Sequence, residues 1–379
     1  MLVATTLLSS PTPLVYGAGC AARPPETAPA VSGAPALNAV DHTFYFTGRS
    51  DNFDPTKPSS DPKDARFDSE SIRVSNDRVH VYISDEYGPY VYEFDRLSGK
   101  RTRVFTLPAK FAVPHPHPTG AQEIPPPGGT SVDDLVGRVA NKGMEGLAIT
   151  PDGKMLVGAM QSPLIQDGGN NLVAGQYTRI VTIDIATGVT HEYSYPLDGT
   201  TKTTVSDILA VNDHEFLVDE RDSKGRADSA TSPSAAGFKR LYEIDLNGAT
   251  DVSAGTGQAY LAARALRKTL FLDVVNVLTS DPLDMDAHLI PAKLEGIAFG
   301  EDVMIDGVRK HTLYVGNDND FLAVFPDPNP GAAPFDNSNQ WFVFSFTDSD
   351  LPGYVPQHFE PEHHDDRSDW SGREGHDRN

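Results

Sequence analysis

The residues best suited to chemistry in this sequence are acids that recur at the start of a repeated unit. Each unit opens with an acid and a short apolar run, passes through a turn, and closes a second strand-like run with acids or amides. The opening acids are Glu70, Glu145, Asp207 and Glu295, and the closing residues are Asp85-Glu86, Met160-Gln161, Glu220-Arg221 and Asn317-Asp318. The repetition indicates that these side chains occupy equivalent places in successive structural units.

Carboxylates that such a repeat brings together cannot all stay ionised without compensation, and a bound cation is the simplest remedy. The donors are all oxygen atoms, with no cysteine and no regular histidine spacing among them, which favours Ca²⁺ over zinc or a fully protein-bound Mg²⁺. The alternative is structural: the acids cap strand turns or form ion pairs with Arg73, Arg179 and Arg221. Residue types alone leave both interpretations open.

Strands are predicted to position these acids. Runs rich in β-branched or aromatic residues recur at 79–84, 91–94, 155–159, 179–185, 191–195, 215–218, 240–244, 312–315 and 341–346. Three of the strands lead to an Asp and a glycine-containing turn, at Asp95, Asp184 and Asp245, which is typical of outer strands joined by hairpins. One segment, 259–278, has the apolar spacing of a helix. A wound α/β sheet is excluded, because it needs a helix after nearly every strand.

The repeated units predict an all-β fold, a β-propeller with one inserted helix. The opening acids lie 75, 62 and 88 residues apart, so each unit can hold several strands. At roughly 40–50 residues per blade, the region 39–357 predicts six blades. Because the inner strands of a propeller surround one axis, the opening acids would form a ring at the mouth of its channel.

Composition limits the classes of partner. Lys+Arg 31 against Asp+Glu 53 gives a formal charge of −22 and a pI of about 4.8, without a basic run. Binding to a nucleic-acid backbone or to an anionic membrane surface is therefore disfavoured. Hydrophobic residues make up 39%, enough for a sizeable core, and no stretch approaches the roughly 20 apolar residues of a membrane span.

The two ends of the chain are expected to lie outside the propeller. Residues 1–38 are predicted to be a leader and linker, and residues 358–379 a disordered acidic tail that contains histidines. Cys20, the single cysteine, follows small residues, as in a bacterial lipoprotein signal whose cysteine is acylated. The sequence therefore predicts export, with the protein secreted, periplasmic or attached to a lipid through Cys20.

Seven segments in order resemble a known family. They are Ser84-Asp85-Glu86-Tyr87-Gly88-Pro89, Tyr92-Glu93-Phe94-Asp95, Asn141-Lys142-Gly143-Met144-Glu145-Gly146-Leu147-Ala148, Gln161-Ser162-Pro163-Leu164, Phe216-Leu217-Val218-Asp219-Glu220-Arg221-Asp222, Lys293-Leu294-Glu295-Gly296-Ile297-Ala298 and Asn317-Asp318-Asn319-Asp320. From Asp41 to Tyr354 the chain resembles the phytase-like family, described as having the esterase-like activity of phytase. The resemblance implies an exported β-propeller that hydrolyses phosphate or carboxylic esters.

If the chain hydrolyses esters, metal and carboxylates are expected to perform the chemistry. The sequence contains no Gly-x-Ser-x-Gly elbow, no P-loop and no His-Glu-x-x-His motif. The metal ligands would be Glu70, Glu145 and Glu295, with Asp207 and Asp318 as further candidates, and the general base would be Glu86 or Glu220. Arg221 and Lys142 would neutralise an anionic substrate, with Arg221 close to the reacting group.

Two other functions remain open at this stage. A secreted, non-catalytic propeller could hold Ca²⁺ in the same acidic mouth and serve as a binding or scaffold protein. The Glu-Gly-(Leu/Ile)-Ala units are also similar to those of calcium-dependent propeller lactonases, which act on neutral substrates. A phosphate-ester enzyme is expected to have a basic rim, and a lactonase an apolar pocket beside the metal.

Overall fold

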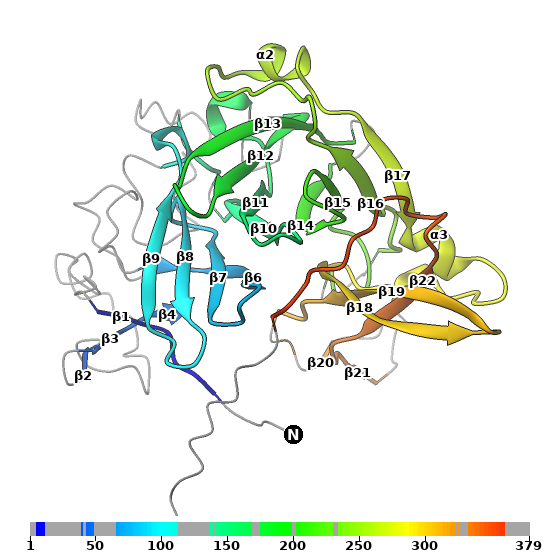
Figure 1. Cartoon of the computed structure of the whole chain (residues 1–379). Coiled ribbons are helices and arrows are strands. Elements are labelled where there is room, and N and C mark those ends of the chain that lie inside the picture. Colours follow the sequence, from blue (N-terminus) through cyan, green and yellow to red (C-terminus); the bar gives the residue numbers. More distant parts are fainter. Residues whose placement is uncertain are drawn as a thin grey trace, which may run out of the picture.

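A computed structural model describes residues 5–11, 39–40, 43–48, 66–112, 136–139, 141–168, 175–198, 202–229, 234–320, 322, 324–325 and 333–360. Four antiparallel sheets follow one another along the chain and lie around a common centre like the blades of a propeller (Figure 1). The first sheet contains β6 (Ser69–Val74), β7 (His80–Asp85), β8 (Tyr90–Asp95) and β9 (Arg101–Thr106). The second contains β10 (Met144–Ile149), β11 (Met155–Met160), β12 (Tyr177–Asp184) and β13 (Thr190–Pro196).

The other two sheets complete the arrangement. The third contains β14 (Thr204–Ala210), β15 (Glu215–Arg221), β16 (Lys239–Asp245) and β17 (Lys268–Asp273), and the fourth contains β18 (Leu294–Ile305), β19 (Val308–Asn317) and β22 (Trp341–Phe346). Smaller strands are β1 (Ser9–Ser10), β2 (Ala39–Val40), β3 (Thr43–Tyr45), β4 (Thr47–Gly48), β5 (Arg66–Phe67), β20 (Val324–Phe325) and β21 (Phe335–Asp336). The short helices are α2 (Gln258–Ala262) and α3 (Val274–Thr279), with 3₁₀ turns η1 (Ala109–Phe111), η4 (Ile165–Asp167) and η5 (Ala287–Leu289).

The all-β propeller is confirmed, but six blades are wrong: the described residues form four. The prediction of six assumed roughly 40–50 residues per blade over the region 39–357, whereas each interval between opening acids, 62 to 88 residues long, holds one sheet. Among the described residues, loops and short helices account for part of each interval, such as the segment 274–293 between β17 and β18. Chain length alone does not distinguish such loops from strands, so it cannot give the number of blades.

The predicted helix over 259–278 is also wrong as a single element. The segment forms α2, the strand β17 and α3, and β17 pairs with β16 as the outer strand of the third sheet. Leu270 and Leu272 alternate along this strand, so a period of two competes with the helical period. Residues 268–273 form a strand and not a helix because they pair with β16 and so provide the outer strand of the third sheet.

Hairpin turns close the sheets as the sequence predicted. Asp95 Oδ1 accepts a hydrogen bond from the backbone of Ser98 at 2.8 Å, and Asp184 Oδ1 accepts one from Thr187 at 2.7 Å. The glycines that follow, Gly99 and Gly188, have positive φ angles of 66° and 76°. The aspartates therefore cap the turns, and only glycine adopts the left-handed position without strain.

Apolar layers hold neighbouring sheets together. Met144, Leu147 and Val181 of the second sheet pack with Val91 and Phe105 of the first in one buried cluster. A second cluster joins the second and third sheets, and a third joins the third and fourth. The first strands of the sheets, β6, β10, β14 and β18, lie innermost and contact one another in that order.

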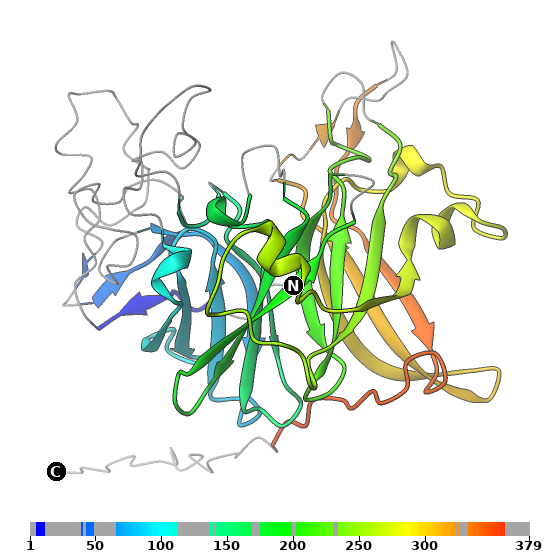
Figure 2. The same cartoon turned by 90° about the horizontal axis from the view of Figure 1, so that it is seen from above.

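A C-terminal strap, residues 351–360, crosses the ends of the inner strands (Figures 1 and 2). Val355 donates its backbone N–H to Val211 after β14, and Gln357 Nε2 donates to the carbonyl of Val74 on β6, both at 2.8 Å. The strap thus links the third sheet to the first across the axis. It borders a cavity of about 620 Å³ at this end, which is lined mainly by apolar side chains of all four inner strands.

Candidate functional site

The opposite end of the axis is formed by the beginnings of the inner strands. In each of these strands the pairing register shifts close to the start, between Ser69 and Ile72, Met144 and Gly146, Val205 and Asp207, and Leu294 and Gly296. A β-bulge of this kind leaves a residue without a partner and redirects its side chain. The residues within the four bulges include Glu70, Glu145, Ser206 and Glu295.

This register corrects the alignment of the third repeat by one residue. Asp207 pairs with Asp219, as Gly146 pairs with Ala159, so Ser206 is the counterpart of Glu145. The sequence pattern is misleading here because Asp207-Ile-Leu-Ala imitates Glu145-Gly-Leu-Ala. Asp207 therefore occupies the position of Gly146 in the second repeat and of Gly296 in the fourth.

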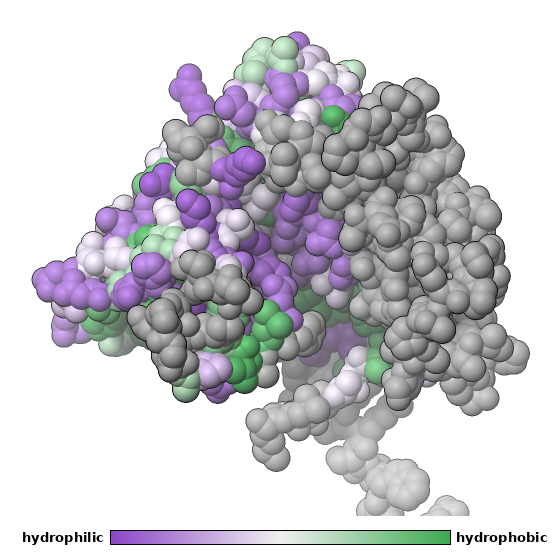
Figure 3. All heavy atoms as spheres, turned by 180° about the vertical axis from the view of Figure 1, so that it is seen from behind, coloured by the Kyte–Doolittle hydropathy of each residue, from purple (hydrophilic) through white to green (hydrophobic). Residues whose placement is uncertain are grey.

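A pocket of about 390 Å³ lies between these strand starts. Its lining residues are Asp68, Ser69, Glu70, Glu145, Ser206, Glu295, Gly296, Gly316, Asn317, Asp318 and Trp341. Seen from behind, hydrophilic side chains gather in a hollow near the middle of the molecule (Figure 3). The structure therefore brings together Glu70, Glu145, Glu295 and Asp318, four of the five predicted metal ligands.

Asp68, Glu70 and Glu86 form the densest group of carboxylates beside this pocket. Each offers one oxygen atom, and these atoms lie within 4.8 Å of one another. Glu86 is only 2% exposed, and burial together with the charges of Glu145 and Glu70 raises its pKa well above the usual value. Glu70 keeps contact with solvent, but desolvation and the neighbouring acids raise its pKa as well. The group is therefore electrostatically strained in the absence of a cation.

Glu145 supplies one buried oxygen, Oε2, that has no hydrogen-bond partner in the part of the chain that the structure describes. The side chain is 6% exposed, and Oε2 accepts no hydrogen bond from the described residues. Burial, then the charge of Glu295, raise its pKa to about 8, against the opposing effects of Arg221 and Lys142. A buried acceptor left unsatisfied costs free energy, so it indicates a site where a ligand completes the bonding.

Close packing of glycines brings these acids together. A Cβ atom on Gly146 would lie 2.8 Å from the backbone of Asp207, so β10 and β14 can approach closely only with glycine there. Gly143 packs in the same way against the backbone of Glu86. Residues that approach a neighbouring backbone so closely leave no space for a side chain.

Cations surround the acids, but each described one already has an anionic or polar partner. Lys142 Nζ donates to Gln161 Oε1 at 3.2 Å, and burial lowers its pKa. Arg221 Nε donates to Ser206 Oγ at 2.8 Å, and its guanidinium also pairs with Glu295. Lys293 Nζ lies 2.8 Å from Asp318, 2.7 Å from Asp320 and 3.4 Å from Glu295.

Two predicted residues point elsewhere. Asp207 accepts hydrogen bonds from Ser71 Oγ at 3.1 Å and from Arg73 at 2.9 Å, and it does not line the pocket. Glu220 is fully buried and binds Tyr195 Oη at 2.9 Å, together with Thr203, Lys268 and the backbone of Asp198. Both acids are therefore held by hydrogen bonds and ion pairs within the fold, and Glu220 does not lie beside the acids that line the pocket.

The structural alternative, ion pairs between the repeated acids and Arg73, Arg179 or Arg221, is supported for two of these arginines. Arg73 pairs with Asp207 and Arg221 with Glu295. The completely buried Arg179 instead pairs with Asp167 at 2.7 Å and Glu192 at 2.5 Å, which are not repeated acids. Of the opening acids, Asp207 and Glu295 therefore form the predicted ion pairs. Glu70 and Glu145 form no ion pair with these three arginines, so the structural alternative does not explain them.

Sequence reasoning missed Asp68 and Trp341, which line the pocket, and Lys293, which pairs with the pocket acids Glu295 and Asp318. Asp68 has no counterpart in the other repeats, so repetition could not indicate it. Lys293 precedes β18 and the bulge at its start, so strand alternation could not indicate its position either. Trp341 comes from β22, far along the chain, and only the pairing of β22 with β19 brings it to Gly316.

The oxygen donors of the pocket fit a hard divalent cation. Carboxylates from Asp68, Glu70 and Glu86 offer the ligand type that Ca²⁺ prefers, and the unsatisfied Oε2 of Glu145 lies in the lining of the same pocket. Cys20 lies outside the described residues.

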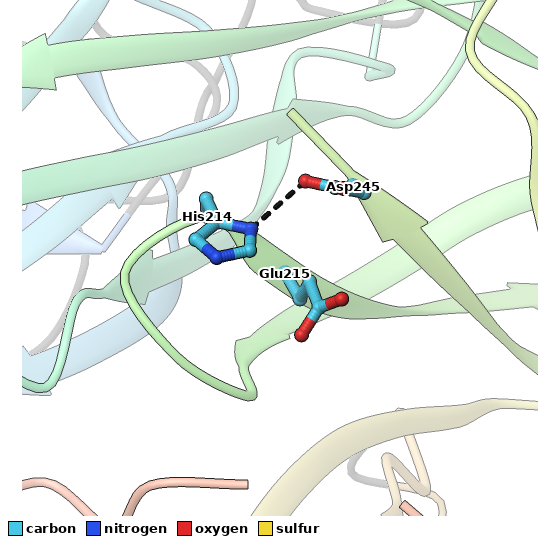
Figure 4. Close-up of side chains that lie close together, drawn as sticks. All are labelled: His214, Glu215 and Asp245. Carbon is cyan, nitrogen blue, oxygen red and sulfur yellow. Dashed lines mark hydrogen bonds and ion pairs between the residues drawn. The ribbon is translucent and has the colours of Figure 1, made fainter. Parts of the chain in front are cut away.

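A second group of potential ligands, His214, Glu215 and Asp245, lies where the start of β15 pairs with the end of β16 (Figure 4). His214 Nδ1 is 2.9 Å from Asp245 Oδ1, which also accepts the backbone N–H of Asn247 at 2.7 Å. His214 and Asp245 are exposed. Asp95 and Asp184 occupy the same position as Asp245 and cap the turns that follow their strands. Turn capping therefore explains why Asp245 is present, without a bound metal.

Comparison with solved structures gives only weak likeness. Hydrazine synthase of Kuenenia stuttgartiensis matches with a TM-score of 0.30 and 12% identity, over 73% of this chain and 63% of that one. An ancestral GH74 enzyme matches with a TM-score of 0.33 and 11% identity, over 73% and 27%. Among the described residues, no helix is long and apolar enough to cross a membrane.

Sequence comparison is more informative. An "Uncharacterized secreted protein" of Arthroderma benhamiae is 32% identical over 184 residues, which cover 42% of this chain and 35% of the relative. The chain thus matches about a third of that protein's length. The model of the family described as "Phytase-like: Esterase-like activity of phytase" matches residues 38–321, most of the chain. The chain therefore belongs to the phytase-like family.

Proposed function

We propose that this chain is an exported, calcium-dependent hydrolase of esters, with its active site in the acidic pocket. The observation that carries the proposal is the set of Asp68, Glu70, Glu86 and Glu145 around one pocket, with a buried carboxylate oxygen that has no described partner. Membership of a family named for esterase-like activity supports the reaction class.

Asp68, Glu70 and Glu86 would hold the cation, because their oxygens can meet at one point. A bound Ca²⁺ would polarise the carbonyl or phosphoryl oxygen of the ester and make a nearby water more acidic. Glu295 and Asp318 already have cationic partners in Arg221 and Lys293, so they are weaker candidates as ligands. The proposed ligands are therefore Asp68, Glu70 and Glu86, and Glu295 and Asp318 become secondary candidates.

Glu145 would act as the general base. Its Oε2 is free to accept a proton, and its raised pKa, about 8, is close to the value that favours proton transfer at neutral pH. Gly146 and Gly143 hold its strand in close packing and so keep the carboxylate in place.

Lys142 and Arg221 would orient the acyl or phosphoryl end of the substrate. Both lie among the acids, and the charges of Glu145 and Glu86 counteract the effect of burial on Lys142. Because each described cation is already paired, the pocket offers little positive charge to a dianionic phosphate. The charge balance therefore favours carboxylic esters over phosphate monoesters.

The proposal of export is supported by the relative named as secreted and by the leader that the sequence predicts over residues 1–38. A lipid anchor at Cys20 is part of the same proposal. Mass spectrometry of the mature protein from its host would distinguish an intact leader, a cleaved leader and an acylated Cys20.

The experiment combines binding and turnover. Calcium is titrated by calorimetry into chelator-treated protein, and hydrolysis of p-nitrophenyl acetate and p-nitrophenyl phosphate is followed in the same samples. The variants are Glu86→Gln for the cation, Glu145→Gln for the base, and Glu301→Gln as a matched control. Glu301 is exposed and lies on β18, at the opposite end of the axis.

We expect Glu86→Gln to weaken calcium binding and Glu145→Gln to lower kcat on the acetate about 10²–10⁴-fold, as for loss of a general base. Glu301→Gln is expected to behave as the unmodified chain. Calcium binding without turnover would favour a non-catalytic calcium-binding propeller. Turnover that survives both substitutions would place the active site elsewhere.

A further inference from the structure

Trp341 is an exposed aromatic ring in the lining of the acidic pocket. It opens β22, the outer strand of the fourth sheet (Figure 1), and its side chain is 65% exposed. Single exposed apolar residues are common on protein surfaces. Trp341 differs from these because it shares a pocket with the buried, unsatisfied Oε2 of Glu145. The family match ends at residue 321, so it does not assign this ring.

The ring of Trp341 is held in a fixed place. Gly316 pairs with Trp341 between β19 and β22, and a Cβ atom on this glycine would lie 2.7 Å from the indole. The six-membered part of the indole therefore rests directly on the backbone of β19. Tyr314 lies against the indole in a T-shaped contact, with 6.5 Å between the ring centroids. A ring that is fixed before binding loses little conformational freedom when a ligand stacks on it.

The polar groups on this side of the pocket offer both acceptors and donors of hydrogen bonds. The side chain of Asp318 is 42% exposed, and that of its partner Lys293 is 33% exposed. Ser69 lies exposed in the same lining. Carboxylate oxygens accept, an ammonium group donates, and a hydroxyl does both. These groups therefore suit a ligand that carries several hydroxyls.

Charge on this side of the pocket is nearly balanced. Lys293 contacts Glu295, Asp318 and Asp320, and Arg221 also pairs with Glu295, so among the described residues three carboxylates face two cations. An organic cation would have to displace Lys293 from its partners, and an anion would approach three carboxylates. An uncharged ligand avoids both costs.

We propose that Trp341 binds a sugar ring, so that the substrate of the acidic pocket is a carboxylic ester of a carbohydrate. The inference rests on the proposed hydrolase function and specifies the alcohol part of the ester. The C–H face of a pyranose would stack on the exposed indole, while its hydroxyls replace water at Asp318, Lys293 and Ser69. A plain aromatic ring would also stack, but it would leave polar groups of the lining without hydrogen bonds.

One substrate can reach Trp341 and the carboxylates together. Asp68 and Glu70 line the pocket from the first sheet and its entry, whereas Trp341 lines it from the fourth, and the volume of about 390 Å³ suits one small ligand. With the sugar on Trp341, Glu145 takes a proton from a water that attacks the acyl carbon. The bond from that carbon to the sugar oxygen breaks, and the sugar oxygen receives the proton. The products are a carboxylic acid and the free sugar.

Fluorescence tests binding independently of turnover. The chain has two tryptophans, so Trp370→Phe leaves Trp341 as the only emitting indole. Four acetates are titrated into this full-length variant in the presence of calcium: methyl glucopyranoside acetylated at its primary hydroxyl, phenyl acetate, acetylcholine and ethyl acetate. We expect a saturable change in the emission of Trp341 with the sugar acetate, and none with the other three at the same concentrations.

Hydrolysis of the same acetates is followed by acid release with the unmodified chain, Trp341→Leu, Trp341→Phe and Val343→Ala. Leucine still covers Gly316 but has no planar face, whereas phenylalanine keeps one. Val343 is the matched control, because it is exposed on the same face of β22 but does not line the pocket. Thermal unfolding checks that the variants fold.

We expect Trp341→Leu to raise KM for the sugar acetate about tenfold with little change in kcat, as for the loss of one stacking contact. Hydrolysis of ethyl acetate should not change. Trp341→Phe is expected to retain most of the affinity for the sugar acetate, and Val343→Ala all of it.

The outcomes separate this inference from the proposed hydrolase. Hydrolysis without a preference for the sugar acetate, or with one that Trp341→Leu leaves intact, would overturn the sugar site alone. Tighter binding of phenyl acetate or acetylcholine to Trp341 would overturn it in favour of an aromatic or a cationic ligand. A saturable response to the sugar acetate without turnover of any ester would support the sugar site and refute the hydrolase. No response and no turnover would overturn both.

Discussion

Replacement of Asp207 separates the structural use of an acid from its use as a metal ligand. The carboxylate joins three inner strands: Oδ1 accepts from Ser71 Oγ at 3.1 Å on β6, and Oδ2 accepts from the backbone of Ile297 at 3.1 Å on β18. Arg73 lies 2.9 Å away, and its side chain is 17% exposed against 5% for Asp207. Asp207→Ala would leave the guanidinium and a buried N–H without their acceptor.

Loss of one partner of a buried ion pair costs about 3–5 kcal/mol. Because Arg73 keeps some contact with water, we expect the lower end, about 3 kcal/mol for Asp207→Ala. Asp207→Asn retains an acceptor oxygen, so we expect about 1–2 kcal/mol, the cost of weakening hydrogen bonds to a charged group. The effect should be a loss of unfolding free energy with little change in the site.

Urea unfolding of both variants measures the two values, and calorimetric titration of calcium measures the site. Glu145→Gln is the matched comparison, because it is equally buried but lacks a described partner for Oε2. We expect it to keep or increase stability and to lose function instead. The reasoning is refuted if Asp207→Ala unfolds at the same urea concentration as the unmodified chain, or if it abolishes calcium binding without a loss of stability.

Three further predictions concern packing, pH and the strap. Gly146→Ala is expected to destabilise the chain by about 1–3 kcal/mol through overpacking against β14, whereas Gly296→Ala, whose Cβ would meet nothing within 4 Å, should be nearly neutral in thermal unfolding. Burial raises the pKa of Asp219 from 3.8 to about 8, so its contribution to stability is complete below pH 3.8 and is lost as the pH rises through 8. Asp219→Asn should therefore flatten the dependence of unfolding free energy on pH over this range, and an unchanged slope would contradict the assignment. Gln357→Ala removes the hydrogen bonds of Nε2 to Val74 O and Asn76 Oδ1, both 2.8 Å, and should cost about 1–2 kcal/mol, with faster amide exchange in the strap as the readout.

The all-β class could be predicted because it depends on local patterns. Alternating β-formers mark the strands, and an Asp followed by a Gly marks hairpins such as Asp95–Gly99 and Asp184–Gly188. The number of blades could not be predicted, because loops and strands contribute equally to the length of a repeat. The segment 259–278 shows the same limit: its apolar residues suit a helix or a strand, and pairing with β16 decides.

For the candidate site, the sequence by itself determined that acids recur at strand starts, and this placed Glu70, Glu145 and Glu295 correctly beside one pocket. Only the tertiary structure decided what each acid contacts. A shift of register by one residue assigns Asp207 to an ion pair and Ser206 to the pocket, since adjacent residues of a strand point to opposite faces. Asp68 and Trp341 reach the site through sheet pairing and close packing, which bring together residues far apart in the chain and leave no periodic signal in the sequence.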